Sequence, residues 1–206
     1  TSNTDSYGIF VSGTTNLNNI TSNFILTGGS GAGGIHFATA NSNRILGNNI
    51  STTGVLGHGI FINASNFINF TANNITTSGN ESFGIFLQKS NSSNITGNFV
   101  TTTGNLSFAV QVDNANNSIY NNVFNTTARH VNITNSANVN NFSLSTITAG
   151  TNIVGGASLG GNFYDNSTVG GQAAYSLTCA DAEGDGICDT SLTHATNNVD
   201  FYPLAK

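Results

Sequence analysis

One short phrase recurs along this chain every 25 residues, and this period constrains the fold more than any other feature. Its first two copies read NNITSNFILTGG at 18–29 and NRILGNNISTTG at 43–54, and three more follow near residues 69, 94 and 118. A fixed period of this length indicates one structural unit stacked on copies of itself. One column of asparagines keeps step through all five copies: Asn23, Asn48, Asn73, Asn98 and Asn122.

Within each unit, apolar and polar residues alternate. Pairs such as Ile35/Phe37 and Ile60/Ile62 bracket a single residue, which is the pattern of a strand with one buried face. Gly, Asn, Ser and Thr separate these strands and favour tight bends. We therefore expect an all-β fold, a parallel β-helix of about six coils stacked at strand spacing. Two packed antiparallel sheets are the alternative, but they would not require a constant register.

The repeat divides the chain into two parts. Residues 1–150 are expected to form the coils, and residues 151–206 a small loop-rich segment that caps one end. In the asparagine column, identical amides at strand spacing can hydrogen-bond from coil to coil. Asn also tolerates the left-handed backbone conformation that a sharp turn requires.

Composition limits the classes of partner. Charged residues make up 6% of the chain, the net charge is −5, and Lys plus Arg number four. So few cations exclude electrostatic binding to nucleic acid, and no apolar run is long enough to span a bilayer. Cys179 and Cys188 flank a short acidic loop, and a disulfide is favoured over a metal pair. These features favour an extracellular or cell-surface protein. The chain begins at Thr1 without Met, as a processed product would.

Many asparagines stand in N-x-S/T glycosylation sequons. The asparagines of the repeating column are never sequons, because the residue two positions later is an inward Ile, Val or Phe. Other sequon asparagines adjoin an inward residue and should face solvent, as a glycan acceptor must. These expected acceptors are Asn19, Asn49, Asn69, Asn74 and Asn94.

The acidic loop resembles a calcium-binding loop in its spacing. Asp181, Glu183, Asp185 and Asp189 occupy positions 1, 3, 5 and 9 of the pattern, and the carbonyl of Ile187 occupies position 7. Oxygen ligands from successive odd positions can converge on one hard cation. The bidentate Glu of position 12 is replaced by Leu192. We expect a structural Ca²⁺ here, and the alternative is an acidic turn without an ion.

The repeats and the tail together resemble the NosD-like family of right-handed parallel β-helix repeat proteins, which are common on archaeal and bacterial surfaces. The specific part is the tail, with GGNFYDN at 160–166, DAEGDGICDT at 181–190 and NNVDFYPL at 197–204. The resemblance covers essentially the whole chain and implies a right-handed β-helix. Named members are linked to copper delivery. This chain has no Met, and its four histidines show no paired ligand spacing, so copper handling is not expected.

A column of large rings should face outward between the inward pairs. Phe10, His36, Phe61 and Phe86 fall in register, and an exposed apolar row of this kind marks a contact surface. The alternative is that another segment covers it. The first coil has no element to shield it, so either the native chain is longer or another copy stacks there.

These features favour a non-enzymatic extracellular protein that assembles with itself into a surface layer, sheath or filament. A polysaccharide-binding or polysaccharide-cleaving β-helix protein is the alternative. Cleavage would need clustered carboxylates on one outer face. The coils offer only Asp5, Glu81 and Asp113, which are better explained as solvated surface charges.

Overall fold

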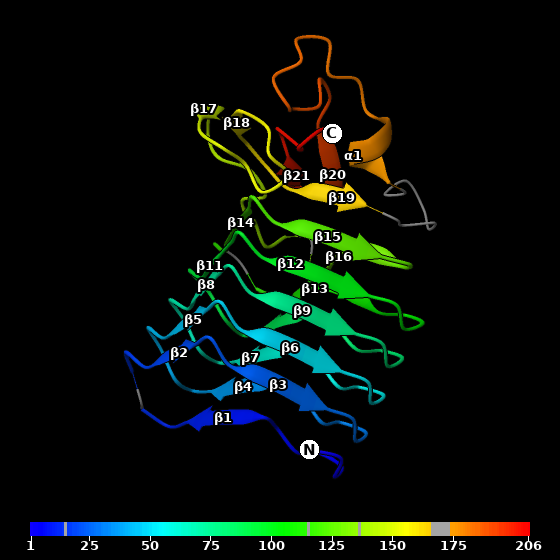
Figure 1. Cartoon of the computed structure of the whole chain (residues 1–206). Coiled ribbons are helices and arrows are strands. Elements are labelled where there is room, and N and C mark those ends of the chain that lie inside the picture. Colours follow the sequence, from blue (N-terminus) through cyan, green and yellow to red (C-terminus); the bar gives the residue numbers. More distant parts are fainter. Residues whose placement is uncertain (15, 115, 136, 166–173) are drawn as a thin grey trace.

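The chain winds into a parallel β-helix, as predicted. A computed structural model describes residues 1–206 except 15, 115, 136 and 166–173. Three parallel sheets run along the rod, and Figure 1 shows their strands stacked in layers from the N-terminus to the tail. The first sheet holds β1 (Ile9–Ser12), β4 (Ile35–Ala38), β7 (Ile60–Asn63), β10 (Ile85–Gln88), β13 (Phe108–Val112) and β16 (Arg129–Ile133).

Each of the five complete coils contributes one strand to each sheet. The second sheet holds β2 (Asn19–Thr21), β5 (Arg44–Leu46), β8 (Asn69–Thr71), β11 (Asn94–Thr96) and β14 (Ser118–Tyr120). The third sheet holds β3 (Phe24–Thr27), β6 (Asn49–Thr52), β9 (Asn74–Thr77), β12 (Phe99–Thr102), β15 (Val123–Thr126) and β19 (Phe163–Asp165).

The number of coils is slightly lower than expected. Five coils are complete, and the sixth consists of β16, a single bridge between Ser118 and Asn141, and β19. Between that bridge and β19 the chain leaves the spiral as the short antiparallel pair of β17 (Thr148–Ala149) and β18 (Ser158–Leu159). The segment expected to be a cap thus supplies the last strand of the third sheet.

The register places equivalent residues directly over one another. Ile35 pairs with Ile9 below and Ile60 above, and Ile85 pairs with Ile60 and Val110. One face of every strand points inward, so the centre of the rod is a continuous stack of Ile, Val, Leu and Phe. Most of these side chains are fully buried, and each removes apolar surface from water.

The asparagine column forms the predicted ladder inside the rod. The Nδ2 of Asn48 donates to the Oδ1 of Asn73 at 3.0 Å, and the backbone N–H of Asn48 donates to the same atom at 3.0 Å. This pair of bonds repeats from Asn23 through Asn122, which donates in the same way to Asn162 of the tail. Burial makes each amide costly unless it is paired, and the column pairs them.

A second column of polar residues lies at the preceding corner, and its two ends have the same pair of Asn–Asn hydrogen bonds. Asn18 donates its backbone N–H and Nδ2 to the Oδ1 of Asn43, at 2.7 and 2.9 Å. Near the other end, Asn117 donates in the same way to Asn140, and Asn140 to Asn198. Ile68 and Ser93 take the middle positions of this column, where the Ser93 hydroxyl accepts the N–H of Ile68.

Tight corners need backbone conformations that few residues adopt. The residue before each asparagine of the main column has a φ of +54° to +69°, as at Ala72 and Gly97. The third-sheet corner needs glycine for a different reason. A Cβ added to Gly54 would lie 1.9 Å from the carbonyl oxygen of Gly29, so successive corners touch through their backbones.

The tail closes the end of the rod opposite the N-terminus (Figure 1). It contains the one-turn helix α1 (Tyr175–Thr178) and the hairpin of β20 (Leu192–Ala195) and β21 (Asn198–Asp200). Here α1 contacts β19, and β20 contacts β16. A small apolar cluster of Phe163, Ile187 and Leu204 joins the disulfide loop to the last coil.

Candidate functional site

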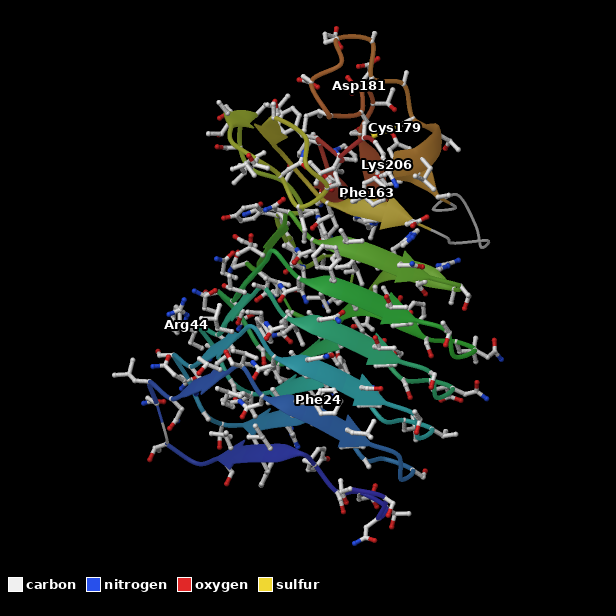
Figure 2. The ribbon with its side chains drawn as sticks, in the orientation of Figure 1. Phe24, Arg44, Phe163, Cys179, Asp181 and Lys206 are labelled. Carbon is white, nitrogen blue, oxygen red and sulfur yellow. A yellow bond between two sulfur atoms is a disulfide. The ribbon has the colours of Figure 1, made fainter. Side chains whose placement is uncertain are left out.

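The acidic loop projects from the capped end, and Figure 2 shows Asp181 and Cys179 there. Carboxylate oxygens of Asp181, Glu183 and Asp189 all lie within 4.8 Å of one another, which brings together three of the four predicted side-chain ligands. Asp185 is not in this group. Among the residues described, no Lys or Arg forms an ion pair with this cluster. The short loop therefore carries a concentration of negative charge.

Backbone hydrogen bonds fix the shape of this loop. The two carboxylate oxygens of Asp181 accept the N–H groups of Asp185 and Gly186, at 3.1 and 3.0 Å. The carboxylate of Asp185 turns back to accept the N–H of Ile187 at 2.9 Å. The Ile187 side chain is buried in the tail, which anchors the loop. A pocket of about 340 Å³ opens beside Glu183, Asp185 and Asp189.

The predicted disulfide is present. Cys179 and Cys188 are bonded, with their Cα atoms 5.5 Å apart. The bond closes the acidic segment into a loop and leaves neither thiol free. The two cysteines are nine positions apart in sequence. By restricting the unfolded chain, the bond stabilises the folded state by about 2–3 kcal/mol.

The aromatic row of Phe10, His36, Phe61 and Phe86 stacks as predicted on the outer face of the first sheet. Successive ring centroids lie 5.0, 4.6 and 5.0 Å apart. The expectation that the whole row faces solvent is wrong for two members. Phe10 is 55% exposed, but His36 and Phe86 retain only 9% and 8%.

A second set of rings at the neighbouring corner covers the row. It consists of Tyr7, His58, Phe83 and Phe108. Tyr7 packs against His36 at 4.6 Å, and His58 packs against Phe86 at 5.3 Å. The rings therefore form two interlocked columns along the rod, in which Phe10 is exposed and Phe61 is half-buried.

Burial keeps the histidines of the coils neutral. The Nδ1 of His58 accepts the backbone N–H of Phe83 at 3.0 Å, which requires an unprotonated Nδ1. Burial lowers the pKa of His58 to about 4, and the neighbouring His36 adds to this. Burial also lowers the pKa of His130 to about 4, although contact with the Asp165 carbonyl opposes the shift.

A buried polar network joins the tail to the last coil, and sequence reasoning missed it. The Asp200 carboxylate accepts hydrogen bonds from the Tyr164 hydroxyl at 2.9 Å and from the N–H of Asn162 at 2.8 Å. The Tyr164 hydroxyl also lies 2.9 Å from the Nε2 of His194. Burial raises the pKa of Asp200 to about 7 against the lowering effect of its hydrogen bonds, and burial lowers that of His194 to about 3.

The sequon asparagines lie on the outside of the rod. Asn19, Asn49, Asn69 and Asn74 are exposed, and Asn94 is half-buried. Asn69 and Asn94 pair on adjacent strands of the second sheet, so glycans on both would compete for the same space. In the part of the chain that the structure describes, no helix has the length and apolarity needed to cross a membrane.

Stacked parallel coils closed by a hairpin define a parallel β-helix repeat protein. The sequence profile of the family described as "Periplasmic copper-binding protein (NosD)" matches residues 1–169. The chain therefore belongs to the NosD family, as the resemblance predicted. No curated protein and no solved structure gives a significant match.

The residues of this chain do not fit the copper of the family's description. Copper prefers imidazole, thiolate and thioether ligands, but the chain has no Met and both cysteines are in the disulfide. Across the described residues, the one group of three or more His, Cys, Asp or Glu with converging ligand atoms is the acidic trio of the loop. A set of carboxylate oxygens suits a hard cation such as Ca²⁺ instead.

Proposed function

We propose that this protein is a non-enzymatic extracellular structural protein that assembles with itself into a cell-surface layer, sheath or filament. The observation that carries the proposal is a pair of exposed leucines on one side of the rod. Leu56 and Leu106 are 48% and 61% exposed at equivalent corners, and Glu81 stands at the equivalent corner of the coil between them. Leu56 lies beside the half-buried Phe61 of the aromatic row. Exposed apolar side chains on the same side of the rod favour lateral contact between rods.

The charges of the coils support a structural role. Glu81 stands at the corner before β10, and Asp113 follows β13 at the opposite edge of the first sheet. Paired carboxylates a few ångströms apart are what glycoside cleavage requires, and these two do not meet that geometry. The outer surface consists mostly of Asn, Ser and Thr, which suits a durable wall material.

Calcium and glycans would strengthen such a material. The trio of Asp181, Glu183 and Asp189 provides oxygen ligands for Ca²⁺, and binding would relieve the repulsion between the carboxylates. The family's periplasmic description and the disulfide agree with a location outside the cytoplasm. Glycans on Asn19, Asn49 or Asn74 would extend from the exposed faces of the rod.

Sedimentation and electron microscopy of the purified protein test self-assembly. We expect association that grows with protein concentration and weakens in the double variant Leu56→Asp and Leu106→Asp. Ser51→Asp and Thr101→Asp on the third sheet are the matched controls, since they add the same charge on another side at the same separation of two coils. A protein that stays monomeric at all concentrations and calcium levels would contradict the proposal.

Polysaccharide binding is a second candidate, favoured by a groove of about 760 Å³ beside the tail. Tyr120, Phe201 and Tyr202 line it together with Asn141 and Asn197. Aromatic faces next to amides can hold a neutral sugar chain. Binding of neutral oligosaccharides that is lost in Phe201→Ala, but kept in Phe24→Ala, would support this candidate. Phe24 is also exposed but lies far from the tail along the rod (Figure 2).

A further inference from the structure

The corner that precedes each strand of the first sheet carries two columns of residues on the outside of the rod. Every coil contributes one residue to either column, and backbone hydrogen bonds between coils keep both columns in register. The residue of the first column has a φ of +50° to +68° in all five complete coils. The first column consists of Asp5, Gly31, Leu56, Glu81 and Leu106, and the second of Tyr7, Gly33, His58, Phe83 and Phe108.

The second coil leaves a gap in both columns, because glycine occupies both of its positions. The backbone requires glycine at neither. Asp5 and Leu56 adopt the same left-handed conformation as Gly31, and the φ of Gly33 lies outside the left-handed region. The gap is a pocket of about 250 Å³. It lies between side chains of the first coil and of the third, so the missing pair of side chains creates it.

Aromatic rings form much of the wall of this pocket. Tyr7, His58 and Phe61 line it. The ring of Tyr7 leans over the gap, since its Cδ1 lies 3.1 Å from the point where a Cβ on Gly33 would stand. The ring centroids of His58 and Phe61 lie 5.7 Å apart. The His58 ring carries no charge at neutral pH, because burial lowers its pKa to about 4. It therefore does not repel a cation in the pocket.

Asp5 carries the only charge among the described residues that line the pocket. A Cβ on Gly31 would overlap the Oδ1 of Asp5, so the carboxylate occupies the space that this glycine leaves. The charge also lies close to the ring of Tyr7. Burial raises the pKa of Tyr7, and the negative charge of Asp5 raises it further. The opposite wall is apolar, because Leu56 forms it.

This combination selects one kind of ligand. A carboxylate attracts a positive charge, and the faces of aromatic rings attract it through their quadrupoles. Ring faces and a leucine side chain favour contact with carbon, so a cation with carbon substituents fits better than a hydrated metal ion. A pocket of this volume is small even for a drug-sized molecule.

We propose that the gap at Gly31 and Gly33 is a binding site for a small organic ammonium ion, with the ammonium held between the carboxylate of Asp5 and the rings of Tyr7 and Phe61. The site adds a ligand to the structural role proposed above and does not depend on that role. Leu56 belongs both to this pocket and to the surface proposed for lateral contact. Binding is therefore measured at protein concentrations below those at which rods associate.

Tetramethylammonium and choline are the probes for this site. The matched control ligand is the alcohol in which a carbon atom replaces the nitrogen of choline, since it keeps the shape and removes the charge. Calorimetry gives the affinity of each ligand. NMR shifts of residues 5–7 and 56–61 distinguish binding in the gap from binding at the acidic loop of the tail.

Variants at the corner test each part of the site. We expect Asp5→Asn to weaken choline binding by about tenfold and Tyr7→Leu to weaken it by about fivefold. Glu81→Gln and Phe108→Leu are the matched controls in the same two columns and should leave the affinity unchanged. Gly31→Leu supplies the side chain that the third and fifth coils carry at this position. It should abolish binding, while thermal unfolding shows that the coils remain folded.

Four results would overturn the proposal. They are the absence of saturable binding by either ammonium ion, equal affinity for the uncharged alcohol, NMR shifts confined to the acidic loop, and binding that survives Gly31→Leu. An unchanged affinity in Asp5→Asn would also contradict it, since the carboxylate would then take no part in holding the charge.

Discussion

Asn162 donates both its backbone N–H and its Nδ2 to one carboxylate oxygen of Asp200, at 2.8 and 3.3 Å. The two residues are 38 positions apart, and this contact fastens the final hairpin to the last layer of the rod. The carboxylate takes the place that an asparagine amide occupies in every earlier rung. The side chain of Asp200 has no amide nitrogen with which to continue the ladder, so the ladder ends at this residue.

The ionisation of Asp200 should oppose the histidines in the pH dependence of stability. Its pKa is raised to about 7 from 3.8, so the folded state holds a proton that the unfolded state releases, and stability falls as pH rises between these values. Asp200→Asn removes this contribution. As the pH rises from 4 to 7, we expect the free energy of unfolding of the variant to increase more than that of the wild type, as measured by urea unfolding. Equal slopes would contradict the buried, protonated carboxyl.

Acid should destabilise the protein through its neutral histidines. The pKa of His58 is lowered to about 4 from 6.5, so its contribution is fully present above pH 6.5 and is lost as pH falls toward 4. Protonation also removes the acceptor that the N–H of Phe83 uses. His58→Asn keeps an acceptor near that position without titrating. We expect unfolding curves of this variant to depend less on pH between 4 and 6.5 than those of the wild type.

Removing one rung should cost far more than removing its neighbour. Asn73→Ala removes the acceptor of the backbone N–H of Asn48, one of the three acceptors of its Nδ2, and the Asn73 amide that donates to the Ile45 carbonyl, and we expect a loss of about 3 kcal/mol. Asn74→Ala changes the next side chain, which faces solvent, and should cost less than about 0.5 kcal/mol. Chemical denaturation of the two variants, made without glycans, checks this difference. A loss for Asn73→Ala as small as that for Asn74→Ala would show that the ladder adds no stability.

The corner glycines predict a second contrast. Gly54→Ala would place a Cβ 1.9 Å from the Gly29 carbonyl oxygen, so the coils would have to separate. Gly28→Ala meets only the Thr53 hydroxyl at 3.1 Å, which can rotate away. We expect Gly54→Ala to lower Tm by several degrees or to prevent folding, and Gly28→Ala to change it little. Tolerance of Gly54→Ala would contradict backbone contact at this corner.

Calcium should stabilise the tail. Binding to Asp181, Glu183 and Asp189 favours the folded loop, so a millimolar excess of Ca²⁺ should raise Tm and a chelator should reverse the rise. Glu183→Gln should reduce this response, and Glu81→Gln on the coils should not. An unchanged Tm with and without Ca²⁺ would remove the metal from the description of the loop.

The repeat predicted the coils because each position has the same neighbours in every unit. Ile35 over Ile60 and Asn48 over Asn73 follow directly from a constant spacing, and the structure confirms both. The sixth coil was overestimated because the chain leaves the spiral between Asn141 and Phe163, where no repeat sets the register.

The parts that sequence reasoning missed lie where the period fails. Asp200 ends the main asparagine column but lies outside the repeat, so the 25-residue spacing does not predict its role. The available signal was the N-x-D pattern at 198–200, whose Asn and Asp are the last acceptors of the two columns. The covering of His36 and Phe86 was missed because His58 falls outside the outward column. Its place at the corner next to Phe83 becomes clear only in three dimensions.

At the corners of Gly29, Gly54 and Gly79 the backbones of successive coils are in contact, so adjacent coils are one strand spacing apart. Since each layer depends only on those beside it, loss or duplication of a whole repeat changes the length of the rod by one strand spacing, about 4.8 Å, and leaves the kinds of contact intact. A gene for such a protein can therefore vary its reach in discrete steps by recombination between repeats, without a new core having to evolve each time.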